Sequence, residues 1–167
     1  MIKIGIISDT HGYLDEKLFQ YFESCAEIWH AGDIGNLEVA DQLAAFRTLR
    51  AVYGNVDNHK LRTSIPLHQR FMCEEVSIWI THIGGYPGHY ALNIRDEIKV
   101  NPPKIFISGH SHILKVMPDK KLNLLHINPG AAGFEGFHKV RTAVRFTIDG
   151  KEIKQLEVIE LGPRSIH

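Results

Sequence analysis

The sequence has 167 residues, of which 44% are hydrophobic and 23% charged, as in an ordinary globular domain. Its 19 Lys and Arg residues balance 19 Asp and Glu residues. A zero net charge argues against a general nucleic-acid binder and against a disordered acidic segment. We expect one domain over residues 1–167. The 11 histidines are about three times ordinary usage. Because histidine is the commonest metal ligand, their positions matter most.

The N-terminal sequence and the two cysteines predict the cellular compartment of the protein. The N-terminus lacks the basic and long apolar regions of a secretory signal, and no apolar run is long enough to span a membrane. We therefore expect a cytoplasmic protein without a membrane partner. In that compartment Cys25 and Cys73 are expected to be reduced and buried rather than disulfide-bonded.

The first third of the chain alternates between strand and helix patterns. The nearly continuous apolar run at 2–7 predicts a strand buried on both faces. It is followed by a predicted helix at 14–24, a strand at 26–31, a helix at 36–46 and a strand at 49–53. This alternation predicts a parallel sheet with right-handed crossovers.

The rest of the chain is richer in strands. We predict strands at 71–76 and 77–81, a helix at 90–100 that ends before Pro102, and a buried strand at 104–108. Further strands are predicted at 114–117, 124–127, 142–148 and 152–161, with a hairpin turn at Asp149-Gly150. The lack of helices there predicts an antiparallel section packed on the first sheet.

Most of the predicted parallel strands end in a potential metal ligand, often next to a glycine. The carboxyl ends of parallel strands meet at one edge of a sheet, so we expect these residues to converge in space. Each could instead be structural, since Asp and Asn cap helices and form turns and a lone histidine is usually packed in a core. In chain order they are Asp9, His11, Asp33, Asn55, His82, His110 and His112.

The donor types indicate which metals the site would hold. Two Asp, one Asn and four His provide oxygen and nitrogen but no thiolate, which suits Mn²⁺, Fe, Zn²⁺, Co²⁺ or Ni²⁺ and disfavours Ca²⁺. Seven donors are too many for one tetrahedral ion but suit two ions that share a carboxylate. Such two-metal sites stabilise both the attacking and the leaving oxygen in phosphoester displacement.

In this order the motifs Asp9-x-His11, Gly32-Asp33, Gly54-Asn55, His82 and Gly109-His110-x-His112 resemble the calcineurin-like metallophosphoesterase family. The Gly-Asn-x-Asp run at 54–57 is similar to its small prokaryotic YfcE-type phosphodiesterase branch. The resemblance implies an α/β fold, a four-layer α-β-β-α sandwich of two mixed sheets flanked by helices, with the metal site at the carboxyl ends of the parallel strands. It implies a first ion held by Asp9, His11, Asp33 and His112, and a second held by Asp33, Asn55, His82 and His110.

The same resemblance implies a phosphoesterase that uses two divalent ions, with Mn²⁺ the first choice. A metal-bridging hydroxide would attack phosphorus in a small phosphate ester, most simply a diester, and Asp33, Asn55 and His82 would belong to the catalytic centre. Many family members have a histidine after the metal-binding Asn as general acid, whereas this chain has Val56. Asp57 is a candidate for that role, although a turn or ligand-orienting role is favoured, and His59 is expected to be exposed.

Several roles stay open at this stage. Residues 83–90 form a glycine-rich loop that either contacts substrate or only connects two elements. Arg62, His138 and Arg141 are candidate phosphate binders, while His30 and His126 lie in predicted buried strands and are expected to be hydrogen-bonded. The alternatives to a phosphodiesterase are a phosphomonoesterase or nucleotide hydrolase, or a protein-binding scaffold like the retromer subunit. No nucleic-acid partner is expected, and a homo-oligomer is compatible with the family.

Overall fold

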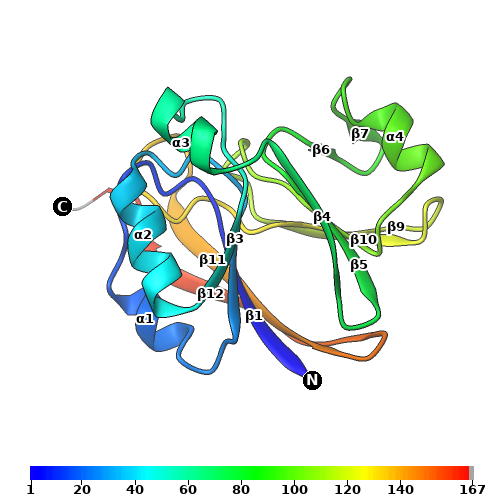
Figure 1. Cartoon of the computed structure of the whole chain (residues 1–167), viewed down its shortest axis with the longest axis horizontal. Coiled ribbons are helices and arrows are strands. Elements are labelled where there is room, and N and C mark those ends of the chain that lie inside the picture. The colour runs from blue at the N-terminus through cyan, green and yellow to red at the C-terminus, as the bar shows by residue number, and fades with distance from the viewer. Residues whose placement is uncertain (166–167) are drawn as a thin grey trace.

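A computed structural model describes residues 1–165, and residues 166 and 167 lie outside it (Figure 1). Its helices are α1 (Lys17–Tyr21), α2 (Leu37–Phe46), α3 (His59–Ser64) and α4 (Arg95–Val100). Its strands are β1 (Ile2–Ile7), β2 (Glu27–His30), β3 (Thr48–Ala51), β4 (His68–Cys73), β5 (Val76–Thr81), β6 (Gly85–Tyr86), β7 (His89–Tyr90), β8 (Ile105–Ile107), β9 (Lys115–Asp119), β10 (Leu124–Asn128), β11 (Val140–Asp149) and β12 (Glu152–Pro163).

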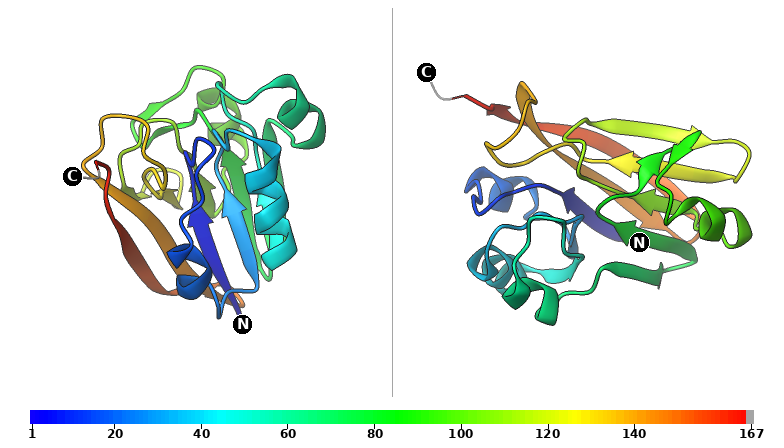
Figure 2. Two further views of the ribbon diagram at one scale, coloured as in Figure 1. Left: turned by 90° about the vertical axis from the view of Figure 1, so that its left-hand side faces the viewer. Right: turned by 90° about the horizontal axis from the view of Figure 1, so that it is seen from above.

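The strands form two five-stranded mixed sheets and one short hairpin. The first sheet has the order β12-β11-β1-β2-β3, with β1, β2 and β3 parallel and with β11 antiparallel to both of its neighbours. The second sheet has the order β4-β5-β8-β10-β9, and its three central strands are parallel. In the left view of Figure 2, β1 and β2 run side by side in the same direction, so their carboxyl ends reach the same edge.

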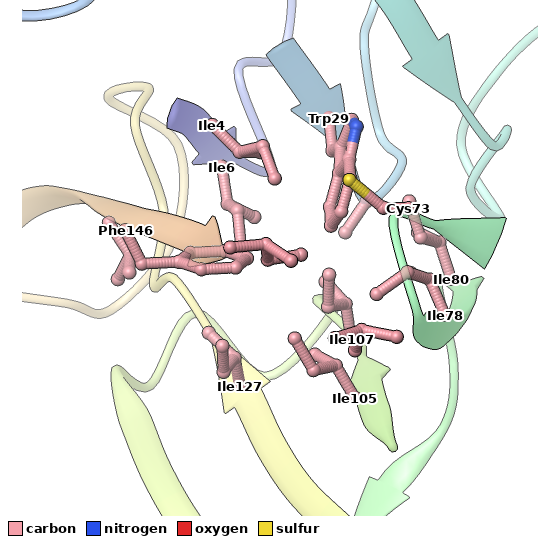
Figure 3. Packing of buried hydrophobic residues seen from close by; sticks show 14 of the residues in the cluster. Ile4, Ile6, Trp29, Cys73, Ile78, Ile80, Ile105, Ile107, Ile127 and Phe146 are labelled. Carbon is pink, nitrogen blue, oxygen red and sulfur yellow. The ribbon is translucent and has the colours of Figure 1, made fainter. Parts of the chain in front are cut away.

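The two sheets pack face to face and helices cover their outer faces, which gives four layers. Ile4, Ile6 and Trp29 of the first sheet meet Ile105 and Ile107 of the second in a fully buried core (Figure 3). A second cluster joins α1 and α2 to the first sheet, and a third joins α4 to the second sheet. The predicted α/β sandwich of two mixed sheets flanked by helices is confirmed.

The prediction that the C-terminal strands pack on the first sheet is wrong for β11 and β12, which are part of that sheet. β11 pairs with the free edge of β1, from Ile2 opposite Ile148 to Ile6 opposite Val144, and β12 follows it in the same sheet. This pairing brings apolar side chains of β11 into the core between the sheets, Phe146 among them. β9 and β10 belong instead to the second sheet.

Some boundaries also differ from the sequence prediction. The helix expected at 90–100 begins only at Arg95, because residues 89 and 90 pair with 85 and 86 in the β6-β7 hairpin. The helix expected at 14–24 is shorter, Lys17–Tyr21. α3 was not predicted, since its one buried side chain, Leu61, leaves no apolar periodicity, and its cap is the Asn58 side chain.

Cys25 and Cys73 are both buried and unpaired, as predicted. None of the helices within residues 1–165 combines the length and apolar character needed to cross a bilayer.

Candidate metal centre

The structure brings the predicted ligands together from both sheets. Asp9 and His11 follow β1, Asp33 follows β2, His82 follows β5, and His112 comes from the loop after β8. Asp9, His11 and His112 form one group, and Asp33, His82 and His110 form another. Within each group the potential ligand atoms lie within 4.8 Å of one another. Parallel strand ends therefore gather the ligands as sheet geometry predicts.

The two groups face each other through their carboxylates. Asp33 Oδ2 lies 3.1 Å from His82 Nε2 in its own group and 3.7 Å from His11 Nε2 in the other. Asp9 Oδ1 lies 3.1 Å from His112 Nε2 and 3.9 Å from His82 Nε2. Each carboxylate is thus within reach of both groups, which is the arrangement that two ions sharing a ligand require.

Each buried carboxylate has one oxygen fixed by the protein and one directed at the cluster. Ser8 Oγ and the His110 backbone N–H donate to Asp9 Oδ2, and the Val56 N–H donates to Asp33 Oδ1. Asp9 Oδ1 is fully buried without a hydrogen-bond partner among the described residues. An acceptor of this kind is costly unless a cation or donor completes it.

Two candidate histidines are oriented in the same manner. His82 Nδ1 donates to the Ala31 carbonyl at 2.7 Å, which leaves its buried Nε2 without a hydrogen-bond partner. His11 Nδ1 lies 3.4 Å from a carboxylate oxygen of Glu135, and its Nε2 is likewise buried and unpartnered. A histidine whose second ring nitrogen is held by an oxygen is the usual setting of a metal ligand. These unpartnered atoms, with their mixed oxygen and nitrogen chemistry, fit divalent metal ions.

Asn55 reaches the second group through His110. The Asn55 side-chain oxygen lies 3.1 Å from His110 Nδ1, and both residues are exposed at the rim. The structure therefore places all seven predicted ligands at one edge of the sandwich.

The backbone of the candidate ligands is unusual. Among residues 1–165, eight non-glycine residues have a positive φ, and five of them are Asp9, His11, Asp33, His110 and His112, with φ between 47° and 70°. Left-handed backbone is disfavoured for residues with a side chain, and it concentrates at functional sites, where the surrounding structure maintains it. Nothing in the order of residue types had indicated this feature.

The carboxylates also shift the acid–base properties of their neighbours. The adjacent Asp9 carboxylate raises the pKa of His112, despite the opposing effect of burial. Burial lowers the pKa of His82, but the adjacent Asp33 carboxylate and the nearby Asp9 charge outweigh burial, so the net shift is upward. Burial raises the pKa of Asp33, but His82 reverses this and the net shift is downward. The negative charge that stabilises these imidazolium ions also favours a metal cation.

Asp57 is buried and acts as a clamp between two loops. Its carboxylate accepts backbone N–H groups from Ile34, Gly35 and Gly54 at 2.8–3.1 Å. The contacts favour the turn role, while His59 lies exposed on α3.

The predicted phosphate binders have different positions. The Arg62 guanidinium donates to the Asn55 and Asp57 carbonyls, so it fixes the turn that carries Asn55. Arg141 is buried and pairs with Asp15 at 2.8 Å, which places its charge in the interior rather than at the rim. The expectation that Arg141 reaches the site as a phosphate binder is therefore wrong. The His138 ring lies 5.1 Å from the His112 ring.

Sequence reasoning missed Glu135, which is distinguished by its contact with His11 across a long chain separation.

The two histidines predicted to be hydrogen-bonded in buried strands, His30 and His126, are confirmed in that role. His30 Nε2 bonds Thr10 Oγ1, and His126 Nδ1 donates to the Phe106 carbonyl. Burial lowers the pKa of each of these two histidines to about 4.

Comparison with known proteins adds a family and a fold. The model of the calcineurin-like phosphoesterase superfamily domain matches residues 2–151. A probable metallophosphoesterase of Methanocaldococcus jannaschii is 31% identical over 134 residues, which are 77% of this chain and 67% of the relative. Another, from Methanothermobacter thermautotrophicus, is 27% identical over 166 residues, 95% of this chain and 92% of the relative.

Two of the solved structures with a similar fold have different descriptions. One is a novel archaeal phosphodiesterase, with 25% identity, a TM-score of 0.74 and coverage of 96% of this chain and all of the other. The other is Vps29 of Entamoeba histolytica in complex with Zn²⁺, with 13% identity, a TM-score of 0.74 and coverage of 98% and 100%. At that lower identity the likeness shows the fold alone.

Proposed function

Because this chain belongs to the calcineurin-like phosphoesterase superfamily, we propose that it is a phosphodiesterase that depends on two divalent metal ions. Mn²⁺ is the first candidate, because the donors are carboxylate, amide and imidazole without thiolate. The proposal that the ester is a diester draws on the likeness to the archaeal phosphodiesterase. We propose a small phosphate ester rather than a nucleic acid as the substrate.

One observation carries the proposal. Two groups of ligands from different strands are joined by the carboxylates of Asp9 and Asp33, and buried ligand atoms in both groups lack a hydrogen-bond partner in residues 1–165. A structural ion needs only one closed set of ligands, whereas paired sets sharing carboxylates fit displacement at phosphorus.

Divalent ions held by these residues supply a lowered pKa for water and positive charge for the phosphate oxygens. The chain itself positions the ligands: Ala31 fixes the His82 ring and Val56 fixes the Asp33 carboxylate. Val56 is 54% exposed and has no ionisable group, whereas many family members have a histidine at this position. We therefore expect faster turnover of esters whose leaving groups need no protonation.

The test is Asp33→Asn, which removes the charge shared by the two groups. With Mn²⁺ and bis(p-nitrophenyl) phosphate, we expect kcat/KM to fall by about 10³-fold or more, since both groups lose a ligand. Isothermal titration should show weaker Mn²⁺ binding in the same variant. Asp41→Asn, at an exposed position on α2, is the matched control and should retain both properties. Unchanged turnover by Asp33→Asn would contradict the assignment.

A protein-binding scaffold is the second candidate. The observation that favours it is a set of exposed apolar side chains next to residues of the site, namely Val56 after Asn55, Ile113 after His112 and the fully exposed Phe137 before His138. A metal site does not decide the question, because a Vps29 of this fold has been crystallised with Zn²⁺. The protein saturated with each of Mn²⁺, Zn²⁺, Co²⁺ and Ni²⁺ should be assayed on mono- and diesters. No turnover with any ion would favour the scaffold.

A further inference from the structure

A pocket of about 210 Å³ opens beside His110, on the outer face of the second sheet. It is separate from the two ligand groups but shares His110 with them. The larger side chains that also form its wall are Ile83, Tyr86, Ile113, Lys115, His126 and Asn128.

The strand register explains how the sequence builds this wall. Along β10, Leu125 and Ile127 point into the core between the sheets, so His126 and Asn128 point to the opposite face. Lys115 of β9 is paired with Asn128 in the antiparallel ladder and therefore lies on the same face.

The loop after β5 covers the pocket and is tied to the sheet. The Ser108 hydroxyl donates to the Gly85 carbonyl, and the Ala91 N–H donates to the Gly84 carbonyl. Gly84 lies so close to the Phe106 ring that an added Cβ would come within 2.6 Å of it. These contacts, with the β6-β7 hairpin, hold the loop in place, so the cavity is preformed.

The wall is mostly apolar, and among its polar side chains Lys115 and His126 offer groups that a ligand could use. The Lys115 ammonium lies 3.6 Å from the centre of the Tyr86 ring and forms no ion pair with any residue of 1–165, so it adds a positive charge at the mouth. The centres of the His89 and Tyr86 rings lie 4.9 Å apart, and this contact fixes the orientation of the Tyr86 ring. Since His126 Nδ1 donates to the Phe106 carbonyl, its Nε2 is the acceptor nitrogen of the neutral ring.

On the basis of the phosphoesterase function above, we propose that this pocket binds the organic substituent of the substrate, and that this substituent is a flat aromatic or heteroaromatic ring. A cavity of about 150 Å³ is enough for benzene, so this one is large enough for a single ring. Its position next to His110 would keep the phosphate at the metal centre while the ring lies in the pocket. The Lys115 charge favours an anionic ester, and His126 favours a ring with a hydrogen-bond donor.

The experiment compares two inhibitors with the same phosphonate group but different substituents. Phenylphosphonate and methylphosphonate compete with bis(p-nitrophenyl) phosphate in the Mn²⁺-loaded protein. We expect the phenyl compound to bind about 10-fold more tightly, as expected for burial of a ring against aromatic and aliphatic walls. In Tyr86→Ala the preference should fall to about 2-fold. Met117→Ala is the matched control, because Met117 lies on β9 opposite His126 but does not line the pocket.

A second measurement does not depend on turnover. Titration of the metal-free protein with phenylphosphonate should shift the NMR amide signals of Gly84, Ala91 and Ser111, which line the pocket, and should leave Met117 unchanged. If hydrolysis is normal but the two phosphonates bind equally well, or if Tyr86→Ala keeps the preference, the pocket proposal is wrong and the phosphoesterase proposal stands. If no ester is hydrolysed, the phosphoesterase proposal fails and the titration alone decides: localised shifts support the pocket, and their absence overturns it.

Discussion

At the scale of single residues, Asp57 differs from the candidate ligands in what its oxygens contact. Both of its oxygens accept backbone N–H groups from the loops after β2 and β3, so it connects the turns that carry Asp33 and Asn55. Asp57→Asn replaces one acceptor oxygen by an NH₂ group that faces N–H donors. We expect the free energy of unfolding to fall by about 2–3 kcal/mol, because hydrogen bonds to a charged acceptor are lost. Urea denaturation measures this change.

The same variant separates the clamp role from the general-acid role. If Asp57 only positions ligands, kcat should fall by the same factor for p-nitrophenyl esters and for alkyl esters, whose leaving groups need a proton. A much larger loss for the alkyl esters would identify Asp57 as the acid and contradict the clamp assignment. Rates should be compared at a temperature where the variant is fully folded.

The identities of the candidate ligands were predictable, whereas their conformation was not. Residue type, order and position after a strand were enough to select Asp9, Asp33 and the four histidines, because these properties are local in the sequence. Their left-handed backbone and the contact between Glu135 and His11 depend on packing between distant segments. Arg141 shows the same limit, since its burial beside Asp15 depends on a contact across more than a hundred residues.

At the scale of elements, the glycines at the strand ends keep space open for the ligands. An added Cβ on Gly54 would lie 2.1 Å from an Asp33 carboxylate oxygen, and one on Gly109 would lie 2.8 Å from an Asp9 oxygen. We expect Gly54→Ala to displace the Asp33 side chain and to weaken Mn²⁺ binding by about 10-fold or more, the usual scale for disturbing a ligand's support. Isothermal titration measures this affinity.

Gly88→Ala is the control for that prediction. Gly88 has a φ of 85°, so alanine is strained there, but nothing lies within 4 Å of the added Cβ. It should lower the free energy of unfolding by about 1 kcal/mol and leave Mn²⁺ affinity unchanged. Equal metal affinity in Gly54→Ala and wild type would show that the turn can shift without moving Asp33.

The elements that could be predicted are those with a strong apolar pattern. β1 and α2 were predicted within a residue of their observed bounds, because β1 buries a nearly continuous apolar run and α2 buries apolar side chains at helical spacing. α3 and the β6-β7 hairpin bury few apolar side chains, so tertiary contacts rather than periodicity decide them. The sheet membership of β11 could not be predicted either, since its pairing with β1 joins opposite ends of the chain.

At the scale of the whole molecule, the metal centre depends on how the two sheets pack. Asp9 and Asp33 come from the first sheet, while His82, His110 and His112 come from the second. The core between the sheets, with Trp29 on one side and Ile107 on the other, therefore fixes the distance between the two halves of the site. The close-packed interior explains how ligands far apart in sequence are held close together.

The stability of the whole molecule should depend on pH through its buried histidines. Burial lowers the pKa of His126 to about 4, against 6.5 for the free side chain. Between these values the unfolded chain binds a proton that the folded protein does not, so the stability contribution is complete above pH 6.5 and is lost as the pH falls toward 4. For this one residue the loss is about 3 kcal/mol.

His126→Gln cannot take up that proton, so the free energy of unfolding of the metal-free variant should fall less between pH 7 and 4.5 than that of wild type. Urea titrations at each pH test this, with His59→Gln, at an exposed position, expected to follow wild type. Parallel curves for wild type and His126→Gln would show that His126 is protonated in the folded protein and would contradict the prediction.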